Sequence, residues 1–205
     1  MNKSNRIEDI MSSMKLSEQT EDILSSINYS SENRTNMPRH ILLDGITCRP
    51  VVAVLREINV PFVYQTAKML APKYYLGDKV EDLLLNLLEV NNGNYEAAKK
   101  GVLIIDEVDY LNLRPITEQD KEELSEKEIN DITYSNNYKD EIGHDLFLMM
   151  SGNTYDVNYN DELIEFDTSD LTVICVGDFS KEEKKEKFNQ TYVSKKLTYK
   201  DTIKR

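Results

Sequence analysis

Gly101 to Tyr110 reads GVLIIDEVDY, and this segment indicates the class of fold. Four consecutive apolar residues, Val102 to Ile105, run directly into two carboxylates, Asp106 and Glu107. A continuous apolar run of this kind predicts a strand that is buried on both faces, as in a parallel sheet. Open α/β sheets bind their ligands beside the carboxyl ends of such strands. The acidic pair therefore marks a candidate functional site.

A buried strand that ends in Asp-Glu is typical of a Walker B motif. In that interpretation Asp106 holds Mg²⁺ through the water around the ion, and Glu107 orients the water that attacks a phosphate. The plainer alternative is a strand that ends in a solvated acidic turn. A further alternative is a Mg²⁺-dependent phosphohydrolase, with Asp106 on one face of an extended strand end and Glu107 and Asp109 on the other.

Composition limits the possible functions. The chain has 205 residues, enough for one domain with a full core, and a formal charge of −12. Such a charge argues against sequence-independent binding of nucleic acid. No apolar run approaches the length of a membrane helix, and the N-terminus lacks a signal-peptide pattern, so we expect a cytoplasmic protein without a membrane partner. Cys48 and Cys175 are too few for a disulfide framework, and His40 and His144 lack metal-ligand spacing.

The rest of the chain alternates strand and helix patterns. Residues 1–36 read as an N-terminal helical or linker segment, and 37–205 as one α/β domain with a mainly parallel sheet flanked by helices. The polar stretch 112–139 predicts a solvated loop or an exposed helix. Further strands are expected at 41–43, 60–64 and 171–176, a β-hairpin insertion at 154–157 and 163–166, and helices at 51–58, 80–88, 95–100, 142–150 and 181–188.

The turn after the first strand should bind phosphate if the Walker B interpretation is right. A P-loop has the form G-x-x-x-x-G-K-[ST], whereas this chain reads Gly45-Ile46-Thr47-Cys48-Arg49-Pro50-Val51-Val52. The second glycine, the lysine and the hydroxyl ligand are missing, and Pro50 removes a backbone donor. Gly45, Thr47 and Arg49 remain as candidates in a degenerate phosphate loop, although the planar fork of Arg49 does not replace a threaded lysine.

Several segments, in this order, resemble the ClpX-type AAA+ ATPases, the ring-shaped unfoldases that feed a compartmental protease. The segments are ILLDGIT, NVPFVY, YYLGDKVEDLLLNLL, GVLIIDEVDYL and ELIEFDTSDLTVICVGDFS. The resemblance runs from about Pro38 to the C-terminus, with a weaker match around Met14 to Ile27. It implies a P-loop NTPase-like fold, ATP and Mg²⁺ as cofactors, a homo- or hetero-oligomeric ring, a polypeptide substrate and a ClpP-type protease as partner.

The resemblance also assigns residues. Asp106 and Glu107 match the Walker B pair, and Tyr75, Leu76 and Gly77 match the pore loop that grips substrate. Gly177 and Asp178 match the end of the sensor-1 strand, where the family motif is not Asp. The second pore loop aligns with Tyr138 to His144 and keeps only Gly143. The chain stops where the family continues into its arginine finger and its helical lid.

These matches and departures lead to three expectations of function. The first is a ClpX-like module whose ancestral activity is Mg-ATP hydrolysis coupled to protein unfolding, impaired here because the Walker A lysine is missing. The second is a catalytically dead relic or docking module that binds intact family members. The third is a fragment of a disrupted gene without function.

Overall fold

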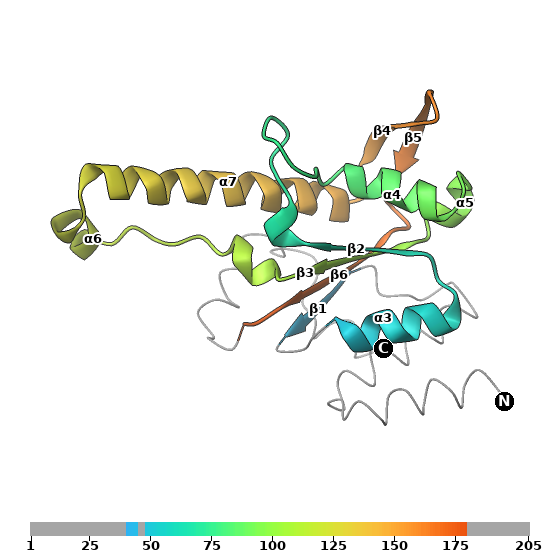
Figure 1. The fold of residues 1–205 in the computed structure, drawn as a ribbon, viewed down its shortest axis with the longest axis horizontal. Helices are drawn as coiled ribbons and strands as arrows, with labels where there is room; N and C mark the ends of the chain where they lie inside the picture. The colour runs from blue at the N-terminus through green and yellow to red at the C-terminus, as the bar shows by residue number, and fades with distance from the viewer. Residues whose placement is uncertain (1–39, 45–47, 180–205) are drawn as a thin grey trace.

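The computed structural model describes residues 40–44 and 48–179. They form a four-stranded parallel sheet with helices on both faces and a separate antiparallel hairpin (Figure 1). The sheet order is β1-β6-β3-β2, from β1 (His40–Asp44), β6 (Thr172–Gly177), β3 (Val102–Asp106) and β2 (Phe62–Thr66). This confirms the predicted α/β class. The helical stripes expected within 1–36 and the helix expected at 181–188 lie outside the described residues.

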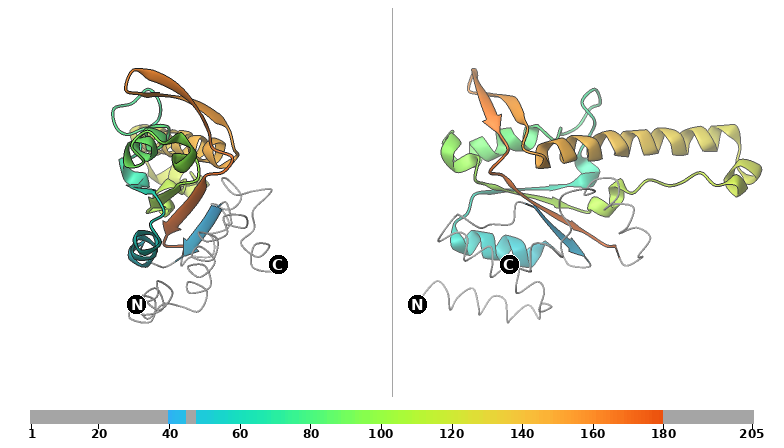
Figure 2. Two further views of the ribbon diagram at one scale, coloured as in Figure 1. Left: turned by 90° about the vertical axis from the view of Figure 1, so that its right-hand side faces the viewer. Right: turned by 180° about the vertical axis from the view of Figure 1, so that it is seen from behind.

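Strand order decides which face each helix covers. The connection from β1 to β2 crosses the whole sheet through α3 (Arg49–Ile58). The connections from β2 to β3 and from β3 to β6 run across the sheet in the opposite direction, each to the neighbouring strand. Parallel crossovers are almost always right-handed, so opposite directions place their helices on opposite faces. Accordingly α3 lies under one face, and α4 (Asp82–Val90) and α7 (Glu126–Met150) lie over the other (Figure 2).

The central strands are buried on both sides, as their unbroken apolar sequence predicts. Alternate side chains point to opposite faces of a strand. Leu103 and Ile105 of β3 therefore pack in the cluster under α4 and α7, whereas Val102 and Ile104 pack against α3. Cys175 of β6 is a buried core residue in the same cluster as Leu103 and Ile105, under α4 and α7.

Some element boundaries differ from the prediction. The strand expected at 60–64 is β2 at Phe62–Thr66. Pro61 precedes it and has no N–H, although its carbonyl accepts a hydrogen bond from the N–H of Val102 at 3.0 Å. The stripe expected at 80–88 becomes α4, which buries Leu83, Leu84, Leu87 and Leu88. A short helix, α5 (Tyr95–Ala98), then leads into β3.

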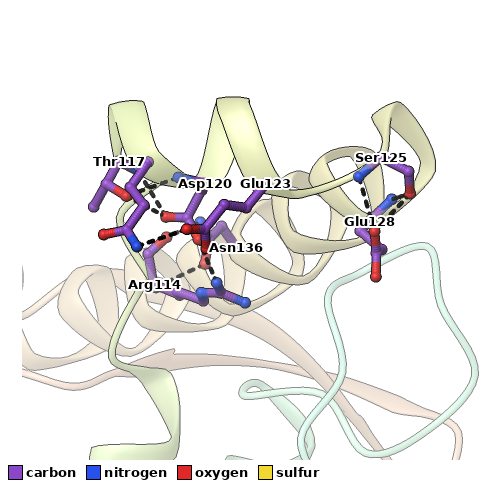
Figure 3. Close-up of polar contacts among 8 residues, drawn as sticks. Arg114, Thr117, Asp120, Glu123, Ser125, Glu128 and Asn136 are labelled. Carbon is purple, nitrogen blue, oxygen red and sulfur yellow. Dashed lines mark hydrogen bonds and ion pairs between the residues drawn. The ribbon is translucent and has the colours of Figure 1, made fainter.

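The predicted exposed polar stretch forms an ordered arm. Residues 112–117 lead through α6 (Glu118–Glu123) into the exposed first part of α7. Asn136 of α7 fixes this segment, since its side chain accepts from the N–H of Arg114 at 2.9 Å and donates to the Arg114 carbonyl at 2.7 Å (Figure 3). Capping boxes, Thr117 with Asp120 and Ser125 with Glu128, begin α6 and α7. The arm extends α7 well beyond the sheet (Figure 1).

One expectation for this region is wrong. Tyr138 to His144, which align with a second pore loop, lie inside α7 and form no loop. Gly143 in this segment is buried against the rest of the domain. The helix predicted at 142–150 is the last third of α7, which buries Ile142, Leu146 and Met149.

The predicted hairpin is present as β4 (Thr154–Tyr159) and β5 (Glu162–Asp167). Asn160 and Asp161, both with positive φ, make the two-residue turn that matches the twist of the strands. Phe166 is buried and meets the ring of Tyr95 edge-on, with 5.6 Å between ring centroids. Among the residues described, no helix has both the length and the apolar character needed to cross a bilayer.

Candidate functional site

All four sheet strands end at one edge, and the acidic pair lies there. In the parallel register Asp106 stands beside Thr66, and Gly177 stands beside Asp44. The carboxyl end of β3 is therefore flanked by the ends of its neighbouring strands, as expected for a ligand site in an open α/β sheet. Two 3₁₀ turns, η1 (Ala67–Met69) after β2 and η2 (Val108–Leu111) after β3, complete this edge.

Both carboxylate oxygens of Asp106 accept hydrogen bonds within the chain. Oδ1 accepts from the backbone N–H of Glu107 at 2.9 Å, and Oδ2 accepts from the hydroxyl of Tyr64 at 3.0 Å. The pKa of Tyr64 is raised, first by burial and then by its hydrogen bond to Asp106. The thiol of Cys48, before α3, also has a raised pKa, again through burial first and Asp106 second. Cys48 therefore stays a protonated, weakly nucleophilic thiol near neutral pH.

Glu107 occupies an unusual backbone position. Its φ of 55° and ψ of 36° lie in the left-handed region, which turns the chain from β3 into η2. A residue with a Cβ pays roughly 1 to 2 kcal/mol for this conformation. Its carboxylate Oε1 lies 2.6 Å from Nζ of Lys68 on η1, and about half of each side chain is exposed. The pKa of Lys68 is raised, chiefly by this hydrogen bond.

Gly177 and Asp178 lie against η2. The backbone N–H of Asp178 donates to Oδ1 of Asp109 at 3.3 Å. A Cβ on Gly177 would come within 2.8 Å of the Phe179 ring and 3.1 Å of both the Asp109 nitrogen and Oδ1. Glycine thus allows the end of β6 to pack closely against the turn that follows the acidic pair.

The phosphohydrolase alternative required an extended strand through Asp109, and this geometry is wrong. β3 ends at Asp106, and residues from Val108 form a 3₁₀ turn. In the described part of the chain, no group of three or more His, Cys, Asp or Glu side chains could hold a metal ion. Mg²⁺ commonly uses one or two carboxylates and completes its shell with water and substrate phosphates. A single carboxylate such as Asp106 would therefore need water and a substrate phosphate to complete such a shell.

The remaining predicted residues are spread over other segments. Arg49 is exposed at the start of α3, whereas Gly45 and Thr47 lie outside the described residues. Tyr75, Leu76 and Gly77 lie in the loop between η1 and α4, which follows Lys68 in the chain. Lys68, Tyr64 and Cys48 were missed by sequence reasoning. Only the pairing of β2 with β3 could have indicated the first two.

Comparison with known proteins finds partial similarity to ATP-binding subunits of the ATP-dependent Clp protease. It is 31% identical over 134 residues to the ATP-dependent Clp protease ATP-binding subunit ClpX 2 of Wolinella succinogenes, covering 64% of this chain and 32% of that protein. It is 45% identical over 60 residues to ClpX 3 of Methylococcus capsulatus, covering 29% of this chain and 14% of that protein. It is 25% identical over 131 residues to ClpX of Treponema denticola, covering 60% of this chain and 28% of that protein.

The chain thus spans about a third or less of the length of these relatives. No protein-family model matches it. The matches to several ClpX subunits agree with the parallel sheet that carries an acidic pair at its carboxyl edge. This chain is therefore a relative of the ClpX-type AAA+ ATPases.

Proposed function

We propose that the chain is a ClpX-like AAA+ module in which ATP hydrolysis is impaired. The domain would span 37–205, with 1–36 as a separate N-terminal segment. The observation that carries the proposal is the acidic pair at the end of β3, with Glu107 bound to Lys68 and Asp106 bound to Tyr64. Glu107, the acid that would orient the attacking water, is instead paired with the ammonium group of Lys68.

The residue roles follow from this proposal. Asp106 would hold Mg²⁺ through water, and Glu107 would orient the attacking water once released from Lys68. Gly45, Thr47 and Arg49 would contact phosphate from the degenerate loop, and Gly177 with Asp178 would border the site. Bound Mg²⁺ neutralises charge on the phosphate oxygens. Phosphoryl transfer depends almost wholly on positioning and such neutralisation, so the missing Walker A lysine should leave hydrolysis near background.

The partners of the family are part of the same proposal. A ring assembly, a polypeptide substrate and a ClpP-type protease would be shared with ClpX, although the chain matches only part of that protein. A second candidate function is a docking module that joins intact relatives without hydrolysing ATP. The hydrogen bonds of both acids favour it, because they engage Asp106 and Glu107 within the chain without a nucleotide.

Calorimetric titration of the full chain with Mg-ATP tests the proposal. We expect a dissociation constant for Mg-ATP no lower than about 100 μM. This corresponds to a free energy of binding of about −5.4 kcal/mol or weaker. Tighter binding that is lost in Asp106→Ala and in Arg49→Ala, together with phosphate release above background, would contradict impairment and indicate a competent subunit. Glu96→Ala is the control, because Glu96 is also an exposed acid paired with a lysine, Lys99, at 2.9 Å.

A repaired variant separates the two candidates. Inserting a complete G-x-x-x-x-G-K-T loop after Asp44 should create Mg-ATP binding that Asp106→Ala abolishes, if the scaffold remains a nucleotide site. No gain of binding by the folded variant would favour the docking module. Sedimentation of the chain mixed with an intact ClpX subunit then measures docking directly.

A further inference from the structure

Along the arm, α7 stands clear of the sheet and keeps one side free (Figure 1). One side packs on residues 112–117 through Asn136. A second side faces the loop before α4, where the ring of Tyr75 meets Tyr134 at 6.2 Å and Tyr138 at 5.1 Å between centroids. Positions three or four apart share one face of a helix. The third side is an exposed stripe, here named the free stripe, of Glu126, Asn130, Thr133, Asn137, Asp140 and His144.

The arm carries acids that its own residues do not neutralise. Asp120 pairs with Arg114 at 2.6 Å, and Glu128 caps the start of α7 with Ser125. Other arm carboxylates are exposed and have neither a hydrogen bond nor an ion pair within 40–44 and 48–179. These are Glu122, Glu126, Asp131 and Asp140. A segment of positive charge would therefore be attracted to the arm.

The complementary charge lies in the same chain. Residues 112–179 contain 17 Asp and Glu against 4 Lys and Arg. Residues 180–205, which lie outside the described residues, contain 9 Lys and Arg against 4 Asp and Glu. From Lys187 onward this segment has six basic side chains and one acid, Asp201. The most acidic and the most basic parts of the chain thus follow each other directly.

The arm and the basic segment also leave the fold at one place. The N–H of Asp178 donates to Oδ1 of Asp109 at 3.3 Å, and the arm begins directly after the turn that holds Asp109. Segments tethered at adjacent points meet at a high effective concentration. α7 is about 37 Å long, and the roughly 16 residues from Phe179 to Lys195 can span up to about 50 Å. The basic side chains can therefore reach the whole arm.

The base of the arm holds a polar group without partners. Both Oδ1 and Nδ2 of Asn112 are buried and make no hydrogen bond in the described part of the chain. A buried amide without partners is costly. Asn136 shows what satisfies such a group here, because its Oδ1 accepts from the N–H of Arg114 and its Nδ2 donates to the carbonyl of the same residue. An extended backbone beside Asn112 would offer the same two groups.

We propose that residues 180–205 dock on the acidic arm of their own chain, with their ammonium groups along the free stripe and beside Glu122. Asn112 would bind the backbone of this segment at the base of the arm. The common origin of the two segments favours this occupant over a second copy, which would have to overcome the repulsion between two acidic chains. The docking needs no nucleotide and does not depend on the proposed ATP site.

Carbodiimide cross-linking of the full chain, followed by peptide mass spectrometry, tests the docking. The reagent joins a carboxylate to an amine only where the two are in contact. In a mixture of isotopically heavy and light chains, we expect links between the lysines of 195–200 and the unpaired arm carboxylates, with one isotope in both linked peptides. Links between unlike isotopes would overturn the proposal in favour of a second copy. The absence of links to the arm would overturn it outright.

A neutralised arm gives a second test. The full-chain variant Glu122→Gln, Glu126→Gln, Asp131→Asn and Asp140→Asn removes the unpaired charges and leaves both capping boxes intact. Trypsin should cleave within 180–205 at least about threefold faster than in the wild type, because paired lysines are shielded. At about 1 M salt, where the Debye length is about 3 Å, the two chains should be cleaved alike.

A matched control neutralises four exposed carboxylates outside the arm. In Glu89→Gln, Asp156→Asn, Glu162→Gln and Glu165→Gln, cleavage should stay at the wild-type rate. Equal acceleration in both variants would overturn the proposal, since net charge alone would be the cause. Equal rates in the wild type and the folded arm variant would overturn it too. Asn112→Leu should also speed cleavage, and an unchanged rate there would overturn the part assigned to Asn112.

Discussion

Nζ of Lys68 lies 2.6 Å from Oε1 of Glu107, and this ion pair joins the turn after β2 to the residue after β3. Lys68 also precedes the loop that carries Tyr74 and Leu76. Glu107 and the loop that the resemblance assigns as a pore loop are thus linked by one short segment. The pair is about half exposed, so it orients the side chains more than it stabilises the fold.

Glu107→Gln should lower the pKa of Lys68 toward its ordinary value of 10.5, because the hydrogen bond to the carboxylate is the main cause of the raised pKa. A cation whose pKa is raised by folding contributes stability below 10.5, and that stability is lost as the pH rises through the folded value. NMR titration of the Lys68 side chain measures the change. Glu96→Gln is the matched control, and an unchanged Lys68 pKa in Glu107→Gln would mean that the pair does not form in solution.

Gly177→Ala should destabilise the fold by about 1 to 3 kcal/mol, the usual cost of overpacking a filled core. The added Cβ would approach the Phe179 ring at 2.8 Å and the backbone nitrogen of Asp109 at 3.1 Å. Urea unfolding measures the loss. Stability equal to wild type would show that η2 can move away from β6 at no cost.

Phe166→Ala should cost about 3 to 5 kcal/mol, because a fully buried aromatic ring is removed. The edge-on contact with Tyr95, which ties the hairpin to α5, is lost as well. Leu163→Ala on the same strand should change stability by less than about 0.5 kcal/mol, since this side chain is exposed. Equal losses in thermal or urea unfolding for the two variants would contradict the burial described for β5.

The arm should loosen in acid. The pKa of Asp120 is lowered from 3.8, first by its hydrogen bond with the backbone of Thr117, and that of Glu128 is lowered from 4.5, first by the side chain of Ser125. Acids with lowered folded pKa values contribute stability above their ordinary values, and this is lost as the pH falls through the folded values. Hydrogen exchange of 117–131 should therefore accelerate below about pH 4. In Asp120→Asn with Glu128→Gln the acid-dependent step should disappear.

Ser125→Ala should weaken the start of α7 by about 0.5 to 2 kcal/mol, the usual cost of losing an N-cap hydroxyl. Exchange of the amides at 126–129 reports this local effect. Ser135→Ala, on the exposed middle of the same helix, is the control. Equal protection in both variants would show that the capping box does not hold the helix end.

The sequence alone determined the sheet and its candidate edge. The apolar run from Val102 to Ile105 can be satisfied only by burial on both faces, and Leu83 to Leu88 follows a helical stripe. The positions of Asp106 and Glu107 at a strand end follow from the same pattern. The roles proposed for these acids, for the phosphate-loop residues and for the residues after β6 remain predictions.

The groups that contact those acids could be identified only from the three-dimensional arrangement of the strands. Tyr64 and Lys68 reach Asp106 and Glu107 because β2 pairs with β3 in a register that no local pattern specifies. The ring contacts of Tyr75 likewise require α7 to pass beside a loop about 60 residues earlier in the chain. Local periodicity sets strands and helices through burial and backbone geometry, whereas contacts between distant segments depend on strand order, crossover hand and packing.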